Sequence, residues 1–154
     1  MSKGQFPYAN ATSGGAARDE ITRLLRRFGC ERVGFMEDFE GGSVLLQFEH
    51  RGRQVQLKAS AKGWVAGYLR ENPWNSRRRG TRNDHEQKAV AQGLIAVNSI
   101  LRDWVKGQVT AIECGILEFD AAFMPYMLLS DGRRVIDHAR DKNLLPAPKD
   151  QANG

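Results

Sequence analysis

Residues 43–60 read SVLLQFEHRGRQVQLKAS, and the alternation of apolar and polar side chains in this stretch decides the fold class. Side chains at every second position share one face of a β-strand, and here the apolar ones are Val44, Leu46, Phe48, Val55 and Leu57. The opposite face carries Gln47, Glu49, Gln54, Gln56 and Lys58. Between the two runs lies the turn His50-Arg51-Gly52, in which Gly52 can take the positive φ that tight turns need. The stretch therefore predicts a β-hairpin with one apolar face.

The chain before this hairpin predicts one more strand and a helix. Residues 32–36 read as a first strand, and the turn Glu40-Gly41-Gly42 joins it to the hairpin, so the three strands form an antiparallel meander. Upstream, residues 16–28 place apolar side chains at helical spacing and end at Gly29, a residue suited to the left-handed position after a helix. The apolar positions of this helix are Ile21, Leu24, Leu25 and Phe28.

After the hairpin, two helical patterns flank a basic loop. Ser60 can cap a short helix that must stop before Pro73, because the residue before a proline is pushed out of the α region. A long helix follows up to Gly115, with Asn83 or Asp84 as its expected N-cap. Its stripe at steps of three and four consists of Val90, Leu94, Val97, Leu101, Trp104 or Val105, Gln108 and Ile112.

The last part of the chain predicts a small helix-turn element. Pro125 ends a short helical pattern, the turn Asp131-Gly132 follows an apolar run, and residues 135–139 suit a last helical turn. The predicted class is therefore α+β. A three-stranded antiparallel meander packs against an N-terminal helix and one long helix, and the small element closes the C-terminal end.

Length and composition fit one domain. The chain has 154 residues, of which 41% are apolar and 27% charged, a balance typical of globular proteins. We expect a single domain over residues 16–139 that includes the basic loop 73–82, a flexible arm over residues 1–15 and a flexible tail over residues 140–154.

The cysteines and the hydropathy of the sequence indicate the cellular compartment of the protein. Cys30 and Cys114 stand far apart without a CxxC motif, so the sequence predicts free thiols and neither a disulfide framework nor a zinc site. The N-terminal stretch has no apolar segment of signal-peptide length, and no run reaches the roughly 18 apolar residues of a membrane helix. We therefore expect a cytoplasmic protein with no membrane partner.

The net charge of +5 is concentrated in one segment. Residues 70–82 hold five basic residues against one acidic residue, whereas residues 83–154 hold eight against ten. Guanidinium groups bind phosphate oxygens through paired hydrogen bonds, and aromatic rings stack on unpaired bases. The predicted nucleic-acid-binding residues are Arg77, Arg78, Arg79, Arg82 and Trp74, and Trp64 and Tyr68 are further candidate stacking faces. The alternative is a solvated loop beside aromatic side chains of the core.

Short signatures of chemistry are absent from the sequence, including the Walker loop, GxGxxG after a strand, HExxH, GxSxG and the EF-hand spacing. The histidines share no periodicity and read as surface residues: His50, His85 and His138. Glu37, Asp38 and Glu40 could hold a divalent cation, although turns between strands collect acidic residues anyway. The sequence predicts no catalytic residue, metal or cofactor and a protein that is not an enzyme, with a metal-dependent nuclease as the weaker alternative.

The helix ARDEITRLLRRFG, the strands VLLQFEHRGRQVQL and the segment VTAIECGILEFDAAFMPYMLLSDGRRV, taken in order, resemble a family of small uncharacterised proteins of tailed bacteriophages and prophages. The family pattern is a long helix ending in Glu-x-Gly-Ile, a Phe-Asp/Glu-rich turn, an apolar run and an Asp-Gly-Arg turn. The matching positions here are 112–116, Phe119-Asp120, 126–129 and 131–133. The resemblance covers most of residues 16–136 and implies a phage or mobile-element setting, but no activity, and the stretch 77–82 departs from the pattern.

Two classes of function stay open at this point. One is a non-enzymatic phage or mobile-element accessory protein that binds nucleic acid through the basic loop, in replication or recombination. The alternative is a protein-binding inhibitor of a host defence system, an anti-CRISPR or similar counter-defence factor, that uses the same loop. The near-heptad stripe of the long helix also suggests a homodimer, although such a stripe equally suits packing on the protein's own sheet.

Overall fold

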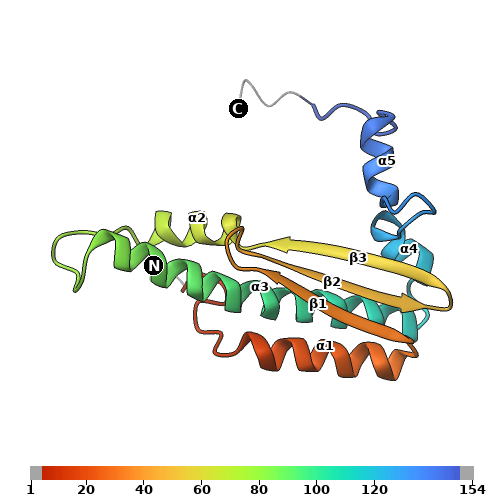
Figure 1. Cartoon of the computed structure of the whole chain (residues 1–154), viewed down its shortest axis with the longest axis horizontal. Coiled ribbons are helices and arrows are strands. Elements are labelled where there is room, and N and C mark those ends of the chain that lie inside the picture. The colour runs from red at the N-terminus through yellow and green to blue at the C-terminus, as the bar shows by residue number, and fades with distance from the viewer. Residues whose placement is uncertain (1–4, 150–154) are drawn as a thin grey trace.

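The computed structural model describes residues 5–149 (Figure 1). In chain order their helices and strands are α1 (Gly14–Phe28), β1 (Arg32–Asp38), β2 (Ser43–His50), β3 (Arg53–Ser60), α2 (Lys62–Glu71), α3 (Arg82–Glu113), α4 (Phe119–Phe123), the short 3-10 helix η1 (Met124–Tyr126) and α5 (Val135–Asp141).

Within the described residues the strands form one antiparallel sheet in the order β1-β2-β3. The register sets Phe35 beside Leu46 and Leu46 beside Leu57, so apolar side chains line up across all three strands on one face. In the hairpin turn both Arg51 (φ 50°) and Gly52 (φ 79°) are left-handed, as in the type I′ turns that match the twist of paired strands. The α+β class and the three-stranded meander are confirmed.

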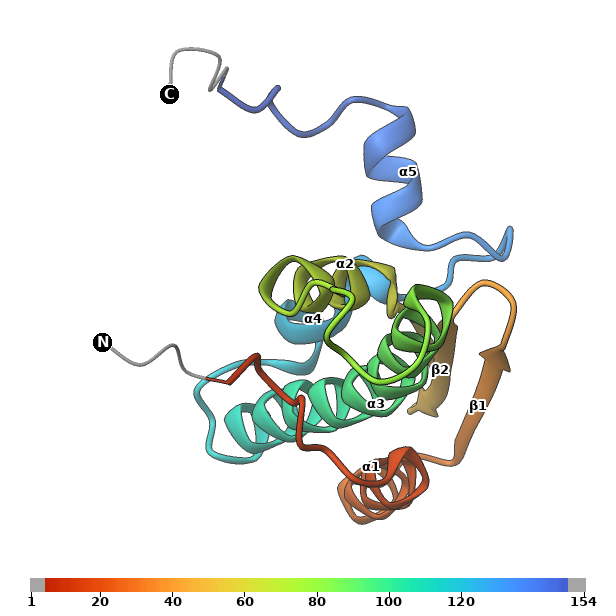
Figure 2. The ribbon, with the colours of Figure 1, turned by 90° about the vertical axis from the view of Figure 1, so that its left-hand side faces the viewer.

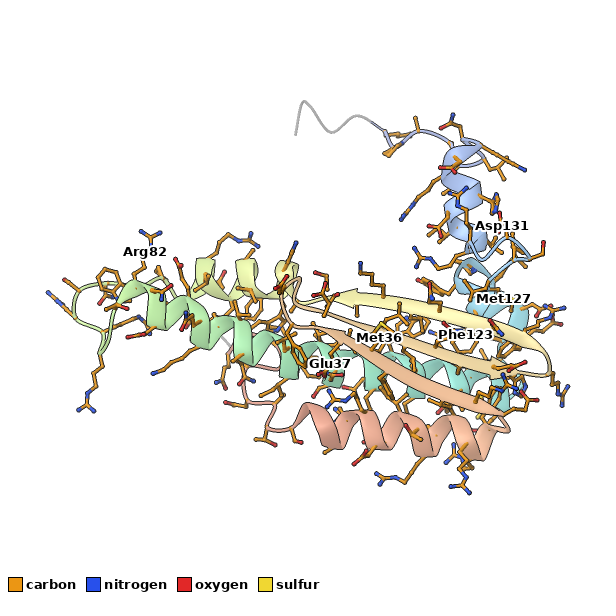
Figure 3. The ribbon with its side chains drawn as sticks, viewed as in Figure 1. Met36, Glu37, Arg82, Phe123, Met127 and Asp131 are labelled. Carbon is orange, nitrogen blue, oxygen red and sulfur yellow. The ribbon has the colours of Figure 1, made fainter. Side chains whose placement is uncertain are left out.

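The helices α1 and α3 lie side by side against the apolar face of the sheet (Figure 2). α1 begins earlier than the predicted residue 16, because the Ser13 hydroxyl accepts a hydrogen bond from the Ala16 amide at 3.1 Å and caps the helix. Side chains at most 1% exposed in the core between helices and sheet include Ile21, Leu25, Leu46, Phe48 and Val105. The opposite face of the sheet is open at Met36, which is 70% exposed (Figure 3).

Helix α3 has 32 residues, and at about 1.5 Å per residue it is about 48 Å long. Its first turns pass the end of the sheet and pack against α2 (Figure 1). There the buried face differs from the predicted stripe, since Ala89 and Gly93 are buried while Val90 is 41% exposed. A Cβ at Gly93 would lie 2.7 Å from Cγ2 of Val65. Small residues thus let α2 and α3 approach closely, which a pattern of large apolar residues does not reveal.

Residues 5–13 lie against α2 and α3, although the sequence predicts a flexible arm over 1–15; residues 1–4 lie outside the described part. The Phe6 ring packs edge-on against Trp64, with centroids 5.3 Å apart. A Cβ at Gly67 would lie 2.7 Å from Cζ of Phe6, so this glycine makes room for the ring. The Gln92 amide donates a hydrogen bond to the Ala11 carbonyl oxygen at 2.9 Å. This segment therefore contributes to the packing around α2.

The C-terminal part extends the sheet edge and then leaves the main body. Met127 bridges to Val55, and the Leu128 amide donates to the carbonyl oxygen of Gln54 at 2.8 Å, which pairs this segment with β3. α5 stands apart from the sheet and the long helices (Figures 1 and 2) and continues to Asp141, past the predicted residue 139. Of the predicted tail, residues 142–149 are exposed without helix or strand, and residues 150–154 lie outside the described part.

Candidate nucleic-acid interface

The arginine loop, residues 73–82, forms one tip of the molecule, where it joins α2 to α3 beyond the end of the sheet (Figure 1). Figure 3 shows Arg82 near this tip, far along the molecule from Met127 and Asp131. Arg77, Arg78, Arg79 and Arg82 are all exposed. The fold therefore brings the predicted phosphate-binding arginines together at a protruding end.

Hydrogen bonds within the arginine loop order its backbone. The Arg78 amide donates to the carbonyl oxygen of Asn75 at 3.0 Å, and the Arg78 guanidinium Nε donates to the carbonyl oxygen of Pro73 at 3.0 Å. Across the loop, the indole Nε1 of Trp74 donates to the carbonyl oxygen of Gly80 at 3.4 Å. A loop that is already ordered loses less conformational freedom when it binds a ligand.

The start of α3 is capped by its own side chains. Thr81, and not Asn83 or Asp84, is the N-cap: its hydroxyl accepts from the Asp84 amide at 3.1 Å, and the Asp84 carboxylate accepts from the Thr81 amide at 3.2 Å. The sequence prediction missed this reciprocal capping box because it placed Thr81 and Arg82 inside the basic loop. Since these amides have partners and a carboxylate stands beside them, contact with an anion falls to the arginine side chains.

The charges of the arginine loop are largely unneutralised. Among residues 5–149, Arg77, Arg78 and Arg79 take part in no ion pair, and Arg82 pairs with Glu86 at 3.2 Å on an exposed helix face. Elsewhere in the described chain seven arginines pair with carboxylates, namely Arg18, Arg27, Arg32, Arg53, Arg102, Arg133 and Arg134. Three adjacent guanidinium groups without an ion pair thus give the tip a local positive charge, which can attract phosphate.

The aromatic candidates have different surroundings. Trp74 is half-buried on the arginine loop and keeps part of its ring accessible. Trp64 is only 9% exposed, and its ring stacks on Tyr68 with centroids 5.2 Å apart and an angle of 8°. Trp64 therefore belongs to the core and is removed from the candidate stacking faces, whereas half-buried Tyr68 reaches a neighbouring cavity.

A cavity of about 410 Å³, the arginine-loop cavity, lies between the loop and the start of α3. Its lining includes Tyr68, Arg78, Arg79, His85, Lys88 and Gln92. His85 Nε2 lies 2.7 Å from the carbonyl oxygen of Asn72, and because a carbonyl only accepts, this nitrogen carries the proton. The sequence analysis did not include His85, Lys88 or Gln92 among the binding residues. Their spacing places them on one face of α3 directly after the arginine loop, and this spacing could have indicated that they extend the site.

In the acidic turn, which carries Glu37, Asp38 and Glu40, two carboxylates make contacts that hold the fold together. Glu37 forms an ion pair with Arg18 of α1, and the Asp38 carboxylate accepts a hydrogen bond from the Gly41 amide at 2.8 Å within the turn. In the described part of the chain, no group of three or more His, Cys, Asp or Glu side chains is arranged to hold a metal ion. Nor does any helix of residues 5–149 have the length and apolar character to cross a membrane.

Of the two uses expected for the apolar stripe of α3, a dimer interface or packing on the protein's own sheet, the structure shows the second. Val97, Leu101 and Val105 are at most 6% exposed and belong to the protein's own core. The Trp104 ring packs edge-on against Phe123 and Tyr126, with centroids 5.8 and 5.7 Å away. A homodimer stays a prediction, and it would need a surface other than this stripe.

Comparison with protein-family models gives no match, and comparisons with curated proteins and with solved structures give none either.

Proposed function

We propose that this protein binds nucleic acid through the arginine loop, as a non-enzymatic accessory protein of a phage or mobile element acting in the host cytoplasm, in replication or recombination. One observation carries the proposal. Arg77, Arg78 and Arg79 are exposed, form no ion pair within residues 5–149, and stand on an internally hydrogen-bonded loop at the tip.

The chemistry of these side chains favours the backbone of the nucleic acid over its bases. Arginines on an exposed loop reach phosphate oxygens from many directions, and such contacts carry no sequence information. Trp74 adds a partly accessible ring beside them, which suits an unpaired base. We therefore expect single-stranded nucleic acid to be bound with little sequence preference.

Salt dependence of binding tests the proposal. If Arg77, Arg78, Arg79 and Arg82 each neutralise one phosphate, log affinity for an oligonucleotide should fall with log salt with a slope of about −0.7 per contact, or roughly −3 for four. Replacing all four with glutamine should flatten the slope by about this amount, measured by fluorescence anisotropy between low and moderate salt.

A matched control separates local contact from net charge. Four exposed arginines outside the tip, which also form no ion pair within residues 5–149, can be replaced by glutamine together: Arg23, Arg26, Arg51 and Arg140. This variant loses the same net charge and should keep most of the slope. If the loop variant binds as well as wild type, or wild type does not bind at low salt, the proposal is wrong and the loop becomes a candidate contact for a host protein.

The proposed function is binding without catalysis, and an assay for cleavage of nucleic acid tests the absence of catalysis. Purified protein incubated with single-stranded DNA, RNA or nucleotides and with magnesium or manganese should leave them intact. Metal-dependent cleavage that disappears when Glu37 and Asp38 are changed to alanine would instead establish a nuclease.

A further inference from the structure

We propose that the arginine-loop cavity binds one nucleotide with a terminal phosphate monoester, either free or at the end of a strand. This inference rests on the proposed function, because it names the part of the nucleic acid that the tip recognises. The cavity holds about 410 Å³, within the range of roughly 300–1,000 Å³ typical of small-molecule sites. That is room for a single nucleotide.

Three cations line the cavity. Arg78 and Arg79 enter from the loop and Lys88 from α3, so positive groups reach the cavity from two elements. None of the described residues that line it is acidic. A phosphate monoester carries a charge of about −1.5 to −2 near neutral pH, whereas an internal diester carries a single charge. Three cations in a lining without a carboxylate therefore match a terminal phosphate better than an internal one.

The uncharged lining residues suit the rest of the nucleotide. Tyr68 lines the cavity, and its ring is held from one side by Trp64 at 5.2 Å. The Tyr68 hydroxyl has no hydrogen-bond partner among residues 5–149, which leaves it for a ligand. The Gln92 amide nitrogen is engaged with the backbone of the N-terminal segment, so its carbonyl oxygen remains as an acceptor. An aromatic ring, a hydroxyl and an amide oxygen can together contact a base and a sugar.

The walls are held in place before a ligand arrives. His85 donates to the carbonyl oxygen of Asn72 at 2.7 Å, which joins the start of α3 to the end of α2. Gln92 joins α3 to the N-terminal segment through the Ala11 carbonyl oxygen at 2.9 Å, and Ala9 of that segment lines the cavity. Walls from the loop, α2, α3 and the N-terminal segment favour a strand end over a strand that passes through.

The experiment compares oligonucleotides that differ only at their ends. A short thymidine oligonucleotide with a 5′-phosphate, with a 3′-phosphate or with hydroxyls at both ends is titrated against the full chain. Unlabelled thymidine monophosphate is the competitor. One terminal phosphate should tighten binding at least about tenfold, the usual effect of added charge-assisted hydrogen bonds. The monophosphate should compete for that advantage. Competition by the monophosphate without an end effect would indicate a free-nucleotide site, which also supports the cavity.

Lys88→Gln is the discriminating variant, because Lys88 lies outside the arginine loop. It should lower the ratio between the affinities for the phosphate-ended and the hydroxyl-ended oligonucleotide, because one of the three cations that line the cavity is removed. Lys106→Gln, an exposed lysine on the same helix, is the control and should leave this ratio unchanged. If oligonucleotides bind but neither terminal phosphates nor the monophosphate has an effect, the cavity proposal is wrong and the proposed function stands. If no oligonucleotide binds at low salt, the proposed function is wrong, and the monophosphate titration still decides the cavity.

Discussion

Trp64 donates a hydrogen bond from its indole Nε1 to the carbonyl oxygen of Pro7, 2.8 Å away. The bond ties the N-terminal segment to α2, and the Phe6 ring beside it packs edge-on against Trp64 and Tyr68. The segment in turn forms one wall of the arginine-loop cavity through Ala9. An N-terminal stretch whose apolar residues show no helical or strand periodicity is thus part of the candidate site.

Phe6→Ala should detach this segment. Losing a half-buried aromatic ring should lower the free energy of unfolding by about 1–2 kcal/mol, less than for a fully buried ring. Residues 5–13 should also become sensitive to limited proteolysis under native conditions. Phe39→Ala is the control, because Phe39 is 75% exposed and its loss should cost less than about 0.5 kcal/mol in the same urea titration. Equal effects of the two changes would contradict the docked position of the segment.

Gly80→Ala should destabilise the junction between the arginine loop and α3. Gly80 has φ +80°, and a Cβ there would lie 3.1 Å from Oδ2 of Asp84, the residue that closes the capping box. The expected cost is about 1–3 kcal/mol in chemical denaturation. Gly107→Ala in the same helix should instead stabilise by about 0.5–1 kcal/mol, since a Cβ there meets nothing within 4 Å. A neutral Gly80→Ala would mean that the loop relaxes freely.

Trp74→Ala should weaken binding of single-stranded nucleic acid by about 1–3 kcal/mol if its ring stacks on a base. The salt slope should hardly change, because the number of phosphate contacts is the same. Trp74→Phe keeps an aromatic face and should retain most of the affinity, although it loses the hydrogen bond to the Gly80 carbonyl oxygen. A slope that falls together with the affinity would show that Trp74 acts by positioning the arginines.

Trp104→Ala should destabilise the chain without changing its mass in solution. The ring packs against Phe123 and Tyr126 of the same chain, so its loss should cost about 2–4 kcal/mol of unfolding free energy. Light scattering of wild type and variant at equal concentration checks the second part. A wild-type dimer that becomes a folded monomer in this variant would place Trp104 in an interface after all.

The two thiols should differ in reactivity. Burial, and to a smaller extent the neighbouring Glu31 carboxylate, raises the pKa of Cys30 to about 12, so at pH 8 it is protonated and a poor nucleophile. Cys114 is exposed at the end of α3. A disulfide reagent should therefore react quickly with Cys114 of the native protein and much more slowly with the partly buried Cys30, which should react quickly only in denaturant. Cys114→Ser should remove the fast phase, and a fast phase that survives would contradict the low reactivity expected of Cys30.

Local patterning was enough to predict most elements of this fold. The period of two in residues 43–60 reports which side chains share a strand face, and the helical period does the same for α1, so the meander and the helix could be predicted. The exposure of the arginines in the arginine loop could be predicted from local sequence as well. Adjacent charged side chains on a loop between two helices are too costly to bury together, so they must face water.

Contacts between distant segments could not be predicted in this way. From the sequence, Gly67 and Gly93 only lower the helix propensity of their segments. In the structure the first makes room for Phe6 and the second for Val65. Tyr68, Lys88 and Ala9 come from three separate elements and meet only because α2, α3 and the N-terminal segment pack closely. Sequence periodicity describes the face of one element, whereas a cavity depends on how close two backbones come. That distance is set by the volumes of side chains far apart in the chain.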